Sequence, residues 1–304
     1  MKDLQTEITA YLTYCSMQKK LSSHTVKAYG IDLAQFISYK DNMSISKQDL
    51  IDYIQHLHEN FKPKTIRRKI ASLKAFIHYL YYQDIIDHNP FDKINTDFKE
   101  PLLLPRIIPE HLLREVLLAL YSNIKSSSTK KEQAASVRNA AVLELLFATG
   151  ARISEICSLR AKDIDLDAQT VRILGKGSRE RIIQIENYDV LSILNRYKSL
   201  FANDIRSDGY FFLNNRKQRL SEQSVRIIIK NLEEQIHSDI HITPHMFRHS
   251  VATLLLEEDV DIRYIQKILG HSSITTTQIY THVTSSKQKE ILRTKHPRNK
   301  IHIN

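Results

Sequence analysis

Glycine is unusually rare in this sequence, and its rarity limits what the chain can fold into. Only 6 of the 304 residues are glycine, whereas glycine makes up about 7% of an average protein. So few glycines exclude a collagen-like fold and most architectures with many β-turns, because tight turns need residues that adopt positive φ. The sequence also lacks a Gly-rich phosphate loop of the GxGxxG or GxxxxGK(S/T) type. Any phosphate chemistry must therefore use side chains.

Charge and cysteine content narrow the class of protein. The 44 Lys and Arg against 34 Asp and Glu give a net charge of +10 and a pI near 9.4. A balance this basic most often indicates an acidic partner, above all nucleic acid, although a charge that only favours solubility is an alternative. The cysteines, Cys15 and Cys157, are too few for a disulfide framework or a four-cysteine zinc site, which fits a reducing compartment.

No segment of the sequence predicts export or a membrane anchor. No run approaches the ~18 apolar residues that cross a bilayer. The first residues, Met-Lys-Asp-Leu-Gln-Thr-Glu, place acids where a signal peptide has a basic and then an apolar region. We therefore expect a soluble, cytoplasmic protein with no membrane partner, associated with the nucleoid when it is bound to DNA.

Proline placement predicts where the chain divides. At roughly 100–200 residues per domain, the length suggests two domains. Four of the seven prolines lie between Pro90 and Pro109, and strong helical periodicity flanks this stretch on both sides. We predict an N-terminal domain over 1–91, an extended linker over 92–106 and a C-terminal domain over 107–304.

The N-terminal domain is predicted to be an all-α bundle. Apolar residues recur at helical spacing in four segments, as at Ile66, Ile70 and Leu73. Ser23 and Ser46 are placed as N-caps of the second and third helices. The expected helices cover residues 3–20, 24–40, 47–59 and 64–82.

The C-terminal domain is predicted to be mainly α with a small antiparallel sheet. A helix starts after Pro109, and the polar run from Ser126 to Lys131 has the composition of an exposed loop. Over residues 164–185, two β-branched segments flank Gly-Lys-Gly-Ser, which predicts two strands and a turn. Further helices are expected at residues 134–148, 188–200, 222–235, 244–257 and 261–269, with Gly150 and Gly270 as end signals and Pro244 as a start signal.

The last helix of the N-terminal domain is strongly basic at its start. Residues 62–74, Lys-Pro-Lys-Thr-Ile-Arg-Arg-Lys-Ile-Ala-Ser-Leu-Lys, contain six cations and no acid. A basic helix face is typical of contact with a phosphate backbone, whereas a solvated face usually mixes both signs. The candidate DNA-binding residues are Lys62, Lys64, Arg67, Arg68 and Lys74.

Two segments of the C-terminal domain place a cation where it can grip a phosphate. In Ala-Thr-Gly-Ala-Arg-Ile-Ser-Glu, residues 148–155, Arg152 can offer its planar fork to two phosphate oxygens and Glu155 can orient it. Lys176 lies between two glycines of the expected turn, where little hinders its approach to a ligand. Taken singly, these patterns more often indicate a surface ion pair and a solvated turn lysine.

A third segment combines histidines with an arginine. His245 and Arg248 are three residues apart and share a helix face, which suits a proton-handling group beside a phosphate clamp. His249 follows His245 at a metal-binding spacing. A zincin helix, however, needs Glu where this chain has Met246, so no metal is expected.

The fourth segment completes a pattern that resembles one family. Leu-Gly-His ends at His271, and Tyr280 follows nine residues later; alone, a tyrosine near a C-terminus is more often a packing residue. The order Arg, hairpin Lys, His-x-x-Arg, Leu-Gly-His and Tyr resembles the signature of the tyrosine recombinases, also called the phage-integrase family. The matching motifs are Ala-Thr-Gly-x-Arg-x-Ser-Glu, His-x-x-Arg-His-Ser-x-Ala-Thr-x-Leu-Leu and Leu-Gly-His-x-Ser-Ile-x-Thr-Thr-Gln-Ile-Tyr-Thr-His-Val. The resemblance reaches from the basic helix to His296-Pro297-Arg298 and is nearest to the Xer or transposon-resolvase type.

The resemblance implies a fold and a set of site residues. It implies an N-terminal core-binding bundle of the SAM-like type and a C-terminal catalytic domain. In relatives of this type, the segment after the tyrosine is a helix donated to a neighbouring protomer. The implied catalytic residues are Arg152, Lys176, His245, Arg248, His271 and Tyr280, with Glu155 and His249 in support.

The resemblance also implies a mechanism. Tyr280 attacks the scissile phosphate and forms a 3′-phosphotyrosyl link, while Arg152 and Arg248 bind the non-bridging oxygens. Lys176 protonates the leaving 5′-oxygen, and His245 accepts or relays the tyrosine proton. The covalent link conserves the bond energy, so no cofactor, ATP or metal is needed.

The implied activity is site-specific recombination of double-stranded DNA through a Holliday junction. Two recombination sites require four protomers, as a homotetramer or as a heterotetramer with a related recombinase. Two alternatives stay open. One is a type IB topoisomerase, which reseals its own strand, and the other is a DNA-binding accessory protein without catalysis.

Overall fold

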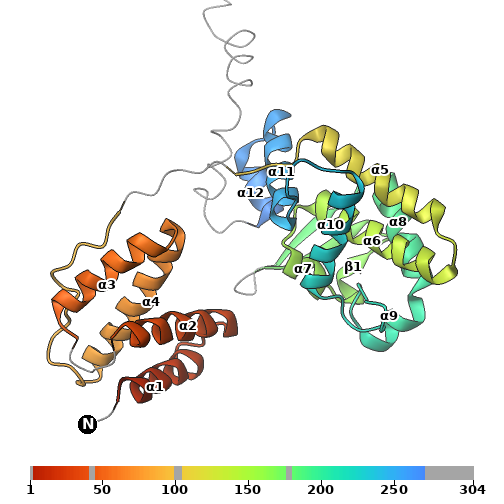
Figure 1. Ribbon diagram of the computed structural model, residues 1–304. Helices are drawn as coiled ribbons and strands as arrows, with labels where there is room; N and C mark the ends of the chain where they lie inside the picture. Colours follow the sequence, from red (N-terminus) through yellow and green to blue (C-terminus); the bar gives the residue numbers. More distant parts are fainter. Residues whose placement is uncertain (1–2, 41–44, 99–104, 176–179, 271–304) are drawn as a thin grey trace, which may run out of the picture. The chain divides into compact units, whose positions relative to one another are not determined.

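The computed structural model describes residues 3–40, 45–98, 105–175 and 180–270 (Figure 1). The chain divides into two compact units, residues 1–102 and 103–304. No helix in the described ranges is both long enough and apolar enough to cross a membrane.

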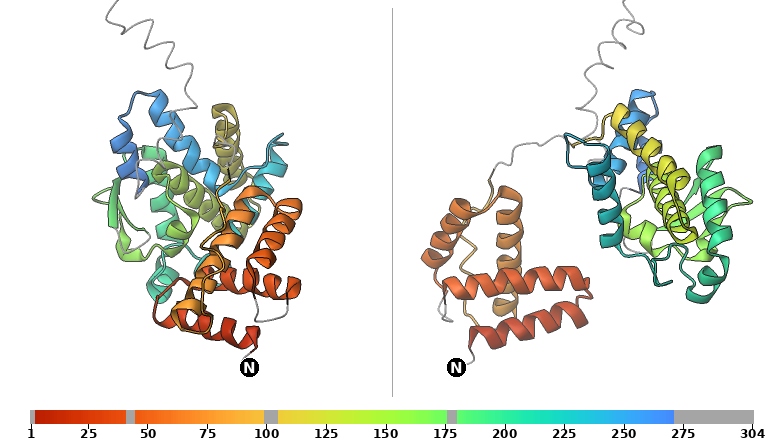
Figure 2. Two further views of the ribbon diagram at one scale, coloured as in Figure 1. Left: turned by 90° about the vertical axis from the view of Figure 1, so that its left-hand side faces the viewer. Right: turned by 45° about the vertical axis from the view of Figure 1, so that its right-hand side comes forward.

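The N-terminal unit is a bundle of four helices, as expected for the first domain. Helices α1 and α2 run side by side, and α4 packs on all three of the others (Figure 2). The apolar stripes of the four helices meet in one core, with Phe36, Phe76 and Ile77 fully buried. The bounds are α1 (Leu4–Met17), α2 (Ser23–Tyr39), α3 (Lys47–Asn60) and α4 (Pro63–Tyr82).

The helix starts confirm one expected cap and correct the other. Ser46 is the N-cap of α3, and it forms a capping box with Asp49. The prediction for Ser23 was wrong, because Ser22 is the N-cap of α2: its backbone is extended and its Oγ accepts a hydrogen bond from the Thr25 N–H at 3.2 Å. Two serines follow one another here, and the N-cap is the one whose backbone is not helical.

The expected linker is partly incorporated into the units on either side. Phe91 is buried in the N-terminal core, and Ile94 and Phe98 pack against it. On the other side, Ile108 is buried in the C-terminal unit, and its N–H donates to Ser250 Oγ at 2.8 Å. Both flanks of the proline-rich stretch therefore contribute to a core.

The C-terminal unit is built around one buried helix. Helix α6 contacts α5, α7, α8, α10 and α11, and almost every residue from Val137 to Leu146 is buried. Its sequence, Ala-Ala-Val-Leu-Glu-Leu-Leu, is apolar on nearly all sides, which is typical of a helix that other elements enclose. The helices of this unit are α5 (Glu110–Ser126), α6 (Lys130–Thr149), α7 (Ile153–Ser158), α8 (Tyr188–Leu200), α9 (Ala202–Asp208), α10 (Glu222–Gln235), α11 (Pro244–Glu257) and α12 (Ile262–Leu269).

A three-stranded antiparallel sheet lies beside these helices. The strands β1 (Ile164–Asp165), β2 (Thr170–Leu174) and β3 (Glu180–Gln184) pair in the order β1-β2-β3. Val171 and Ile173 of β2 alternate with more exposed neighbours and enter the core. Val171 pairs with Ile183, and Leu174 pairs with Glu180 across the turn. The two predicted strands are confirmed, and β1 is an addition.

The polar run from Ser126 to Lys131 is shorter as a loop than expected. Helix α5 continues through Ser126, and α6 begins at Lys130. Thr129 caps α6 in a capping box with Glu132, so a polar stretch that suggested an open loop is mostly helix-capping sequence.

Candidate active site

Arg248 joins three segments that are far apart in the sequence. It lies in α11, whose first residue is the expected Pro244, and it is 3% exposed. Its guanidinium donates to the carbonyl oxygens of Gly150 at 2.7 Å and Leu269 at 2.6 Å. The structure therefore joins the end of α6, the His-x-x-Arg helix and the Leu269-Gly270 end of α12 through one arginine.

The physical basis of this junction is the pair of helix C-termini that Arg248 contacts. The last carbonyls of a helix have no partner within it and carry the negative end of its dipole, so a cation stabilises them. Gly150 ends α6 and Gly270 ends α12, both with left-handed φ, as the sequence predicted. A Cβ built on Gly150 would lie 2.6 Å from Leu269 Cδ2, so the two helix ends need glycine to approach this closely.

Arg152 and Glu155 form the predicted pair at the start of α7. Arg152 is the N-cap, and both its backbone N–H and its Nη1 donate to the Glu155 carboxylate at 2.9 Å. The Glu155 side chain is 5% exposed, whereas that of Arg152 is 36% exposed. Glu155 therefore anchors an arginine whose guanidinium still reaches solvent and can meet a ligand.

Arg181 is a residue of this site that the sequence analysis missed. From β3, its Nη2 and Nη1 donate to the two oxygens of Glu155 at 2.7 and 3.3 Å, and its Nε donates to the Ile268 carbonyl at 2.9 Å. Burial raises the pKa of Glu155, but hydrogen bonds from Arg181 and Arg152 outweigh it, and the pKa lies below its usual value. Arg181 thus connects the Arg152 anchor to the end of α12.

A signal for Arg181 was present in the strand pattern. Arg181 is two residues before the buried Ile183, so both side chains project from the same face of β3. A cation on the inward face of a strand requires a carboxylate or carbonyl partner, because a buried charge is costly alone. The nearby Gly270 also belongs to this arrangement: a Cβ there would lie 2.8 Å from Arg181 Nη1.

The two histidines of α11 differ in environment. His245 is exposed, and His249 is half-buried one turn later. Burial, and then His245 and Arg248, lower the pKa of His249 to about 4. His249 is therefore neutral near pH 7 and can donate or accept a hydrogen bond without adding charge beside Arg248.

Three of the predicted catalytic residues lie outside the described residues. These are Lys176, His271 and Tyr280. The described chain reaches the sequence around two of them: β2 ends at Leu174 and β3 begins at Glu180, on either side of Lys176, and Gly270 immediately precedes His271.

The basic helix is α4, and its cations have different environments. Lys62, Lys64 and Arg67 are exposed, as a DNA-contacting face requires. Arg68 is also exposed, but it forms an ion pair with the buried Asp32 of α2. Lys74 is half-buried and donates to Thr96 Oγ1.

One cation of the basic segment has a different role from the one expected. Lys69 is 3% exposed, and it pairs with Asp32 at 3.1 Å. Ser72 also donates to Asp32, at 2.9 Å. A buried lysine is stable here because the carboxylate compensates its charge, so the basic run is partly a core element and only partly a surface.

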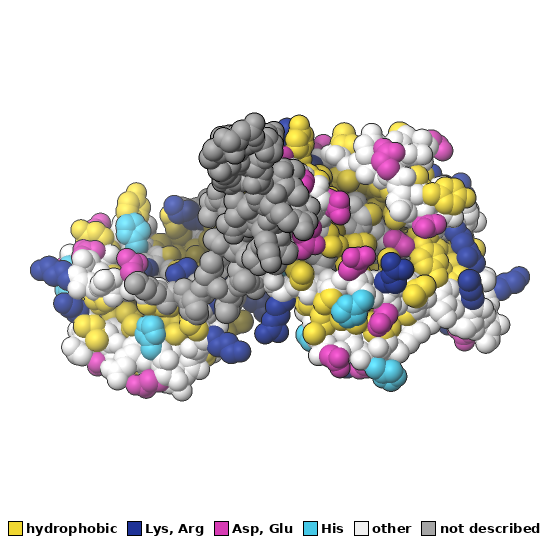
Figure 3. All heavy atoms as spheres, turned by 90° about the horizontal axis from the view of Figure 1, so that it is seen from above, with side chains coloured by type: hydrophobic (Ala, Val, Ile, Leu, Met, Phe, Trp, Pro, Cys, Tyr) yellow, Lys and Arg dark blue, Asp and Glu magenta, His cyan; other side chains and the backbone are white. Residues whose placement is uncertain are grey.

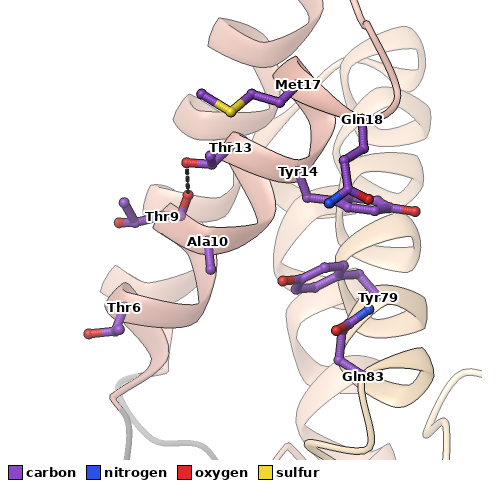
Figure 4. Close-up of a pocket in the computed structure, with 9 residues that line it drawn as sticks. All are labelled: Thr6, Thr9, Ala10, Thr13, Tyr14, Met17, Gln18, Tyr79 and Gln83. Carbon is purple, nitrogen blue, oxygen red and sulfur yellow. Dashed lines mark hydrogen bonds between the residues drawn. The ribbon is translucent and has the colours of Figure 1, made fainter.

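A groove between α1 and α4 has no charged side chain in its lining (Figure 4). Thr6, Thr9 and Thr13 line one wall, and Tyr79 and Gln83 line the other. The Thr13 hydroxyl donates to the Thr9 carbonyl at 2.9 Å, within the helix. With no cation and no carboxylate, this groove has none of the groups that bind or cleave a phosphodiester.

The described residues hold no group of three or more His, Cys, Asp or Glu side chains placed to bind a metal ion. His245 and His249 are one helical turn apart, but within the described ranges no group of three possible ligands includes them.

The chain is a helical bundle followed by a helical domain, and a buried arginine joins the Arg-x-x-Glu and Leu-Gly segments of the second domain. Comparison with known proteins identifies the class of enzyme. Residues 110–287 match the Phage integrase family, and residues 8–84 match the Phage integrase, N-terminal SAM-like domain. The chain belongs to the phage integrase family and is a tyrosine recombinase, an enzyme that cleaves and rejoins DNA at specific sites. The fold class expected from the sequence is thereby confirmed.

Named relatives cover the whole chain. The chain is 51% identical to a tyrosine recombinase of Agathobacter rectalis, with 100% of each chain covered. It is 34% identical to tyrosine recombinase XerD of Listeria innocua, covering 98% of this chain and 100% of that protein. Among solved structures, it resembles XerH site-specific recombinase bound to its difH substrate, with a TM-score of 0.76 and 19% identity over 94% of this chain and 84% of that one.

Proposed function

We propose that Tyr280 attacks a scissile DNA phosphate while Arg152 and Arg248 bind its non-bridging oxygens. The observation that carries this proposal is the pair of hydrogen bonds that Arg248 donates to the ends of α6 and α12. These bonds hold the segments that lead to Arg152 and to His271 beside one arginine. These contacts support the proposal, because they fix Arg248 and hold the start of the Arg152 segment next to it.

The two arginines have the chemistry that the reaction requires. Attack on a phosphodiester increases the negative charge on the non-bridging oxygens, and a guanidinium offers two parallel N–H donors to such a group. The backbone and Glu155 fix the orientation of Arg152, and the helix ends fix that of Arg248. Each preorganised donor of this kind contributes about 10²-fold or more to the rate.

The remaining steps are proton transfers. We propose that His245 accepts the proton of the Tyr280 hydroxyl as the 3′-phosphotyrosyl bond forms. Lys176 gives a proton to the 5′-oxygen as the P–O bond breaks, because a lysine pKa falls readily near other cations whereas arginine stays protonated. His271 donates a hydrogen bond to the phosphate. The neutral His249 supports α11 beside Arg248.

The test is covalent capture on a nicked suicide substrate, prepared from a duplex that the wild-type chain selects from a random library. We expect Tyr280→Phe to bind this duplex but to form no covalent protein–DNA complex. Tyr264→Phe is a matched control, because Tyr264 is 62% exposed on α12 and outside the proposed site. Cleavage by the wild-type chain should persist in EDTA. A covalent complex with Tyr280→Phe, or activity that EDTA removes and Mg²⁺ restores, would refute the assignment.

We also propose that four protomers assemble on two DNA sites through a groove of the C-terminal unit. Helices α5, α6 and α11 contribute an apolar lining, including Leu113 and Phe147, with five acids and one cation at the same surface. Figure 3 shows a face of this unit on which acidic and apolar side chains lie close together. The acids of the groove are Glu110, Glu144, Asp189, Glu257 and Glu258.

The chain has a segment of complementary composition to occupy this groove. After Tyr280, the sequence contains six Lys and Arg, one Glu and the apolar Ile291, Leu292, Ile301 and Ile303. We propose that this segment binds the groove of a neighbouring protomer. Glu257→Lys with Glu258→Lys should then reduce the tetramer on two-site DNA in light scattering, while single-site binding is retained. An unchanged tetramer would place the contact elsewhere.

A further inference from the structure

Arg138 is a buried cation that has no acidic partner among the described residues. It lies in α6 and is 7% exposed. Its Nε and Nη2 donate to Asn139 Oδ1 at 3.2 and 2.9 Å, and its Nη1 donates to Asn215 Oδ1 at 2.6 Å. None of the carboxylates in the described part of the chain forms an ion pair with it. Its charge is therefore met only by the dipoles of two amides.

Other deeply buried cations of this chain are compensated in stronger ways. Lys69 pairs with Asp32, and Arg181 pairs with Glu155. Arg248 donates to the carbonyls of two helix C-termini. A buried charge without such compensation is costly, and burial accordingly lowers the pKa of Arg138. An anion that binds beside Arg138 would therefore compensate a buried charge and would bind favourably.

Arg138 lies at a polar groove between α6, α10 and the turn at residues 214–218. Asn139, Asn215, Gln218 and Asn231 contribute amide side chains, and no carboxylate is among the described residues that line the groove. The turn has a defined geometry, because Asn214 Oδ1 accepts from the backbone N–H groups of residues 216 and 218 at 2.8 and 3.2 Å. This surface is distinct from the acidic groove of α5, α6 and α11.

The amides around Arg138 use their oxygens as acceptors for its guanidinium. The Oδ1 atoms of Asn139 and Asn215 accept from Arg138, so each amide has its Nδ2 left to donate. No described residue pairs with either Nδ2. One guanidinium and two amide N–H₂ groups then belong to residues that line one groove, in which no described lining residue is an acid. Such groups are donors for a phosphate.

We propose that this groove, the Arg138 groove, binds a backbone phosphate of duplex DNA other than the one that is cleaved. The inference rests on the proposed function, because it takes DNA as the ligand. Thr149 is the last residue of α6 and belongs to the same short segment as Arg152. Arg138 and Thr149 are eleven residues apart on α6, which is about 16 Å along a helix. Successive phosphates of one strand advance by about 3.4 Å along the duplex, so Arg138 meets a different phosphate from Arg152. This contact sets the register of the C-terminal unit on its site.

The test measures DNA affinity against salt with a wild-type-selected duplex of about three helical turns (~30 base pairs). Neutralising one phosphate-binding cation lowers the slope of log K against log salt concentration by about 0.9. We expect this loss for Arg138→Gln. Arg196→Gln is the matched control, because Arg196 is exposed on α8 and outside the groove, and its slope should equal that of the wild type.

A second variant separates a DNA contact from a structural role. Asn215→Asp supplies the missing carboxylate to Arg138 from an exposed turn, so it should compete with the phosphate. We expect DNA affinity to fall at least tenfold, with no decrease in the thermal midpoint. Asn195→Asp on α8 controls for the added negative charge and should lower affinity by less than threefold.

The outcomes are distinguishable. Unchanged slopes with Arg138→Gln and unchanged affinity with Asn215→Asp would overturn the Arg138 groove while leaving DNA binding by the wild type intact. Stabilisation of the wild type by inorganic phosphate alone, with no effect of either variant on DNA binding, would reassign the groove to a small anion. A wild-type chain that selects no duplex at all would overturn the proposed function itself.

Discussion

Arg181→Met should destabilise the C-terminal unit by leaving the Glu155 carboxylate buried without its main partner. The side chains of Arg181 and Glu155 are 11% and 5% exposed, and the guanidinium contacts both carboxylate oxygens. Removing one partner of a buried ion pair costs about 3–5 kcal/mol, because the other charge stays desolvated. Arg152 keeps two hydrogen bonds to Glu155, so we expect the lower end, about 3 kcal/mol.

The measurement is urea unfolding followed by far-UV circular dichroism, since the chain has no Trp for fluorescence. With a slope of about 2–3 kcal/mol per molar urea, a loss of about 3 kcal/mol lowers the midpoint by about 1 M. Arg226→Met is the matched control. Arg226 forms an exposed ion pair with Glu222, and such pairs contribute about 0–1 kcal/mol.

A double mutant separates the ion pair from the packing of the arginine stem. In Arg181→Met with Glu155→Met, no charge is left buried between β3 and α7, so the double variant should be more stable than Arg181→Met alone. The reasoning is refuted if Arg181→Met lowers the free energy of unfolding no more than Arg226→Met does. It is also refuted if the loss in the double variant equals the sum of the losses in Arg181→Met and Glu155→Met.

Two further predictions concern pH and salt. In the folded state the His249 side chain stays neutral down to about pH 4, whereas in the unfolded chain it binds a proton below about pH 6.5. The free energy of unfolding should therefore fall as the pH decreases between these values. His249→Gln should flatten this profile in thermal unfolding, and an unchanged profile would contradict the burial argument. Lys64→Gln with Arg67→Gln should lower the salt slope of DNA binding by about 2. The same loss with Lys47→Gln and Lys93→Gln would show that α4 has no special role.

The secondary structure of the chain was largely predictable because it depends on local chemistry. Helical periodicity, capping residues and two helix-ending glycines indicate most helices within a few residues of their observed bounds. The predictions failed where two neighbouring residues compete for one role, as Ser22 and Ser23 do at α2. The short helix α9 was also missed, because seven residues are too few to show a clear period.

The sequence by itself determined most of the helices and the family, because propensity, capping and motif order are properties of neighbours along the chain. It also determined which side chains are chemically able to grip a phosphate. Only the tertiary structure decided which of these cations have buried partners within the protein. Lys69 is buried on Asp32, and Arg181 is linked to Arg152 through Glu155. Arg138 has only amide partners among the described residues. The physical reason is that a buried charge acquires its role from the partners that other segments supply, and their distance along the chain does not reveal them.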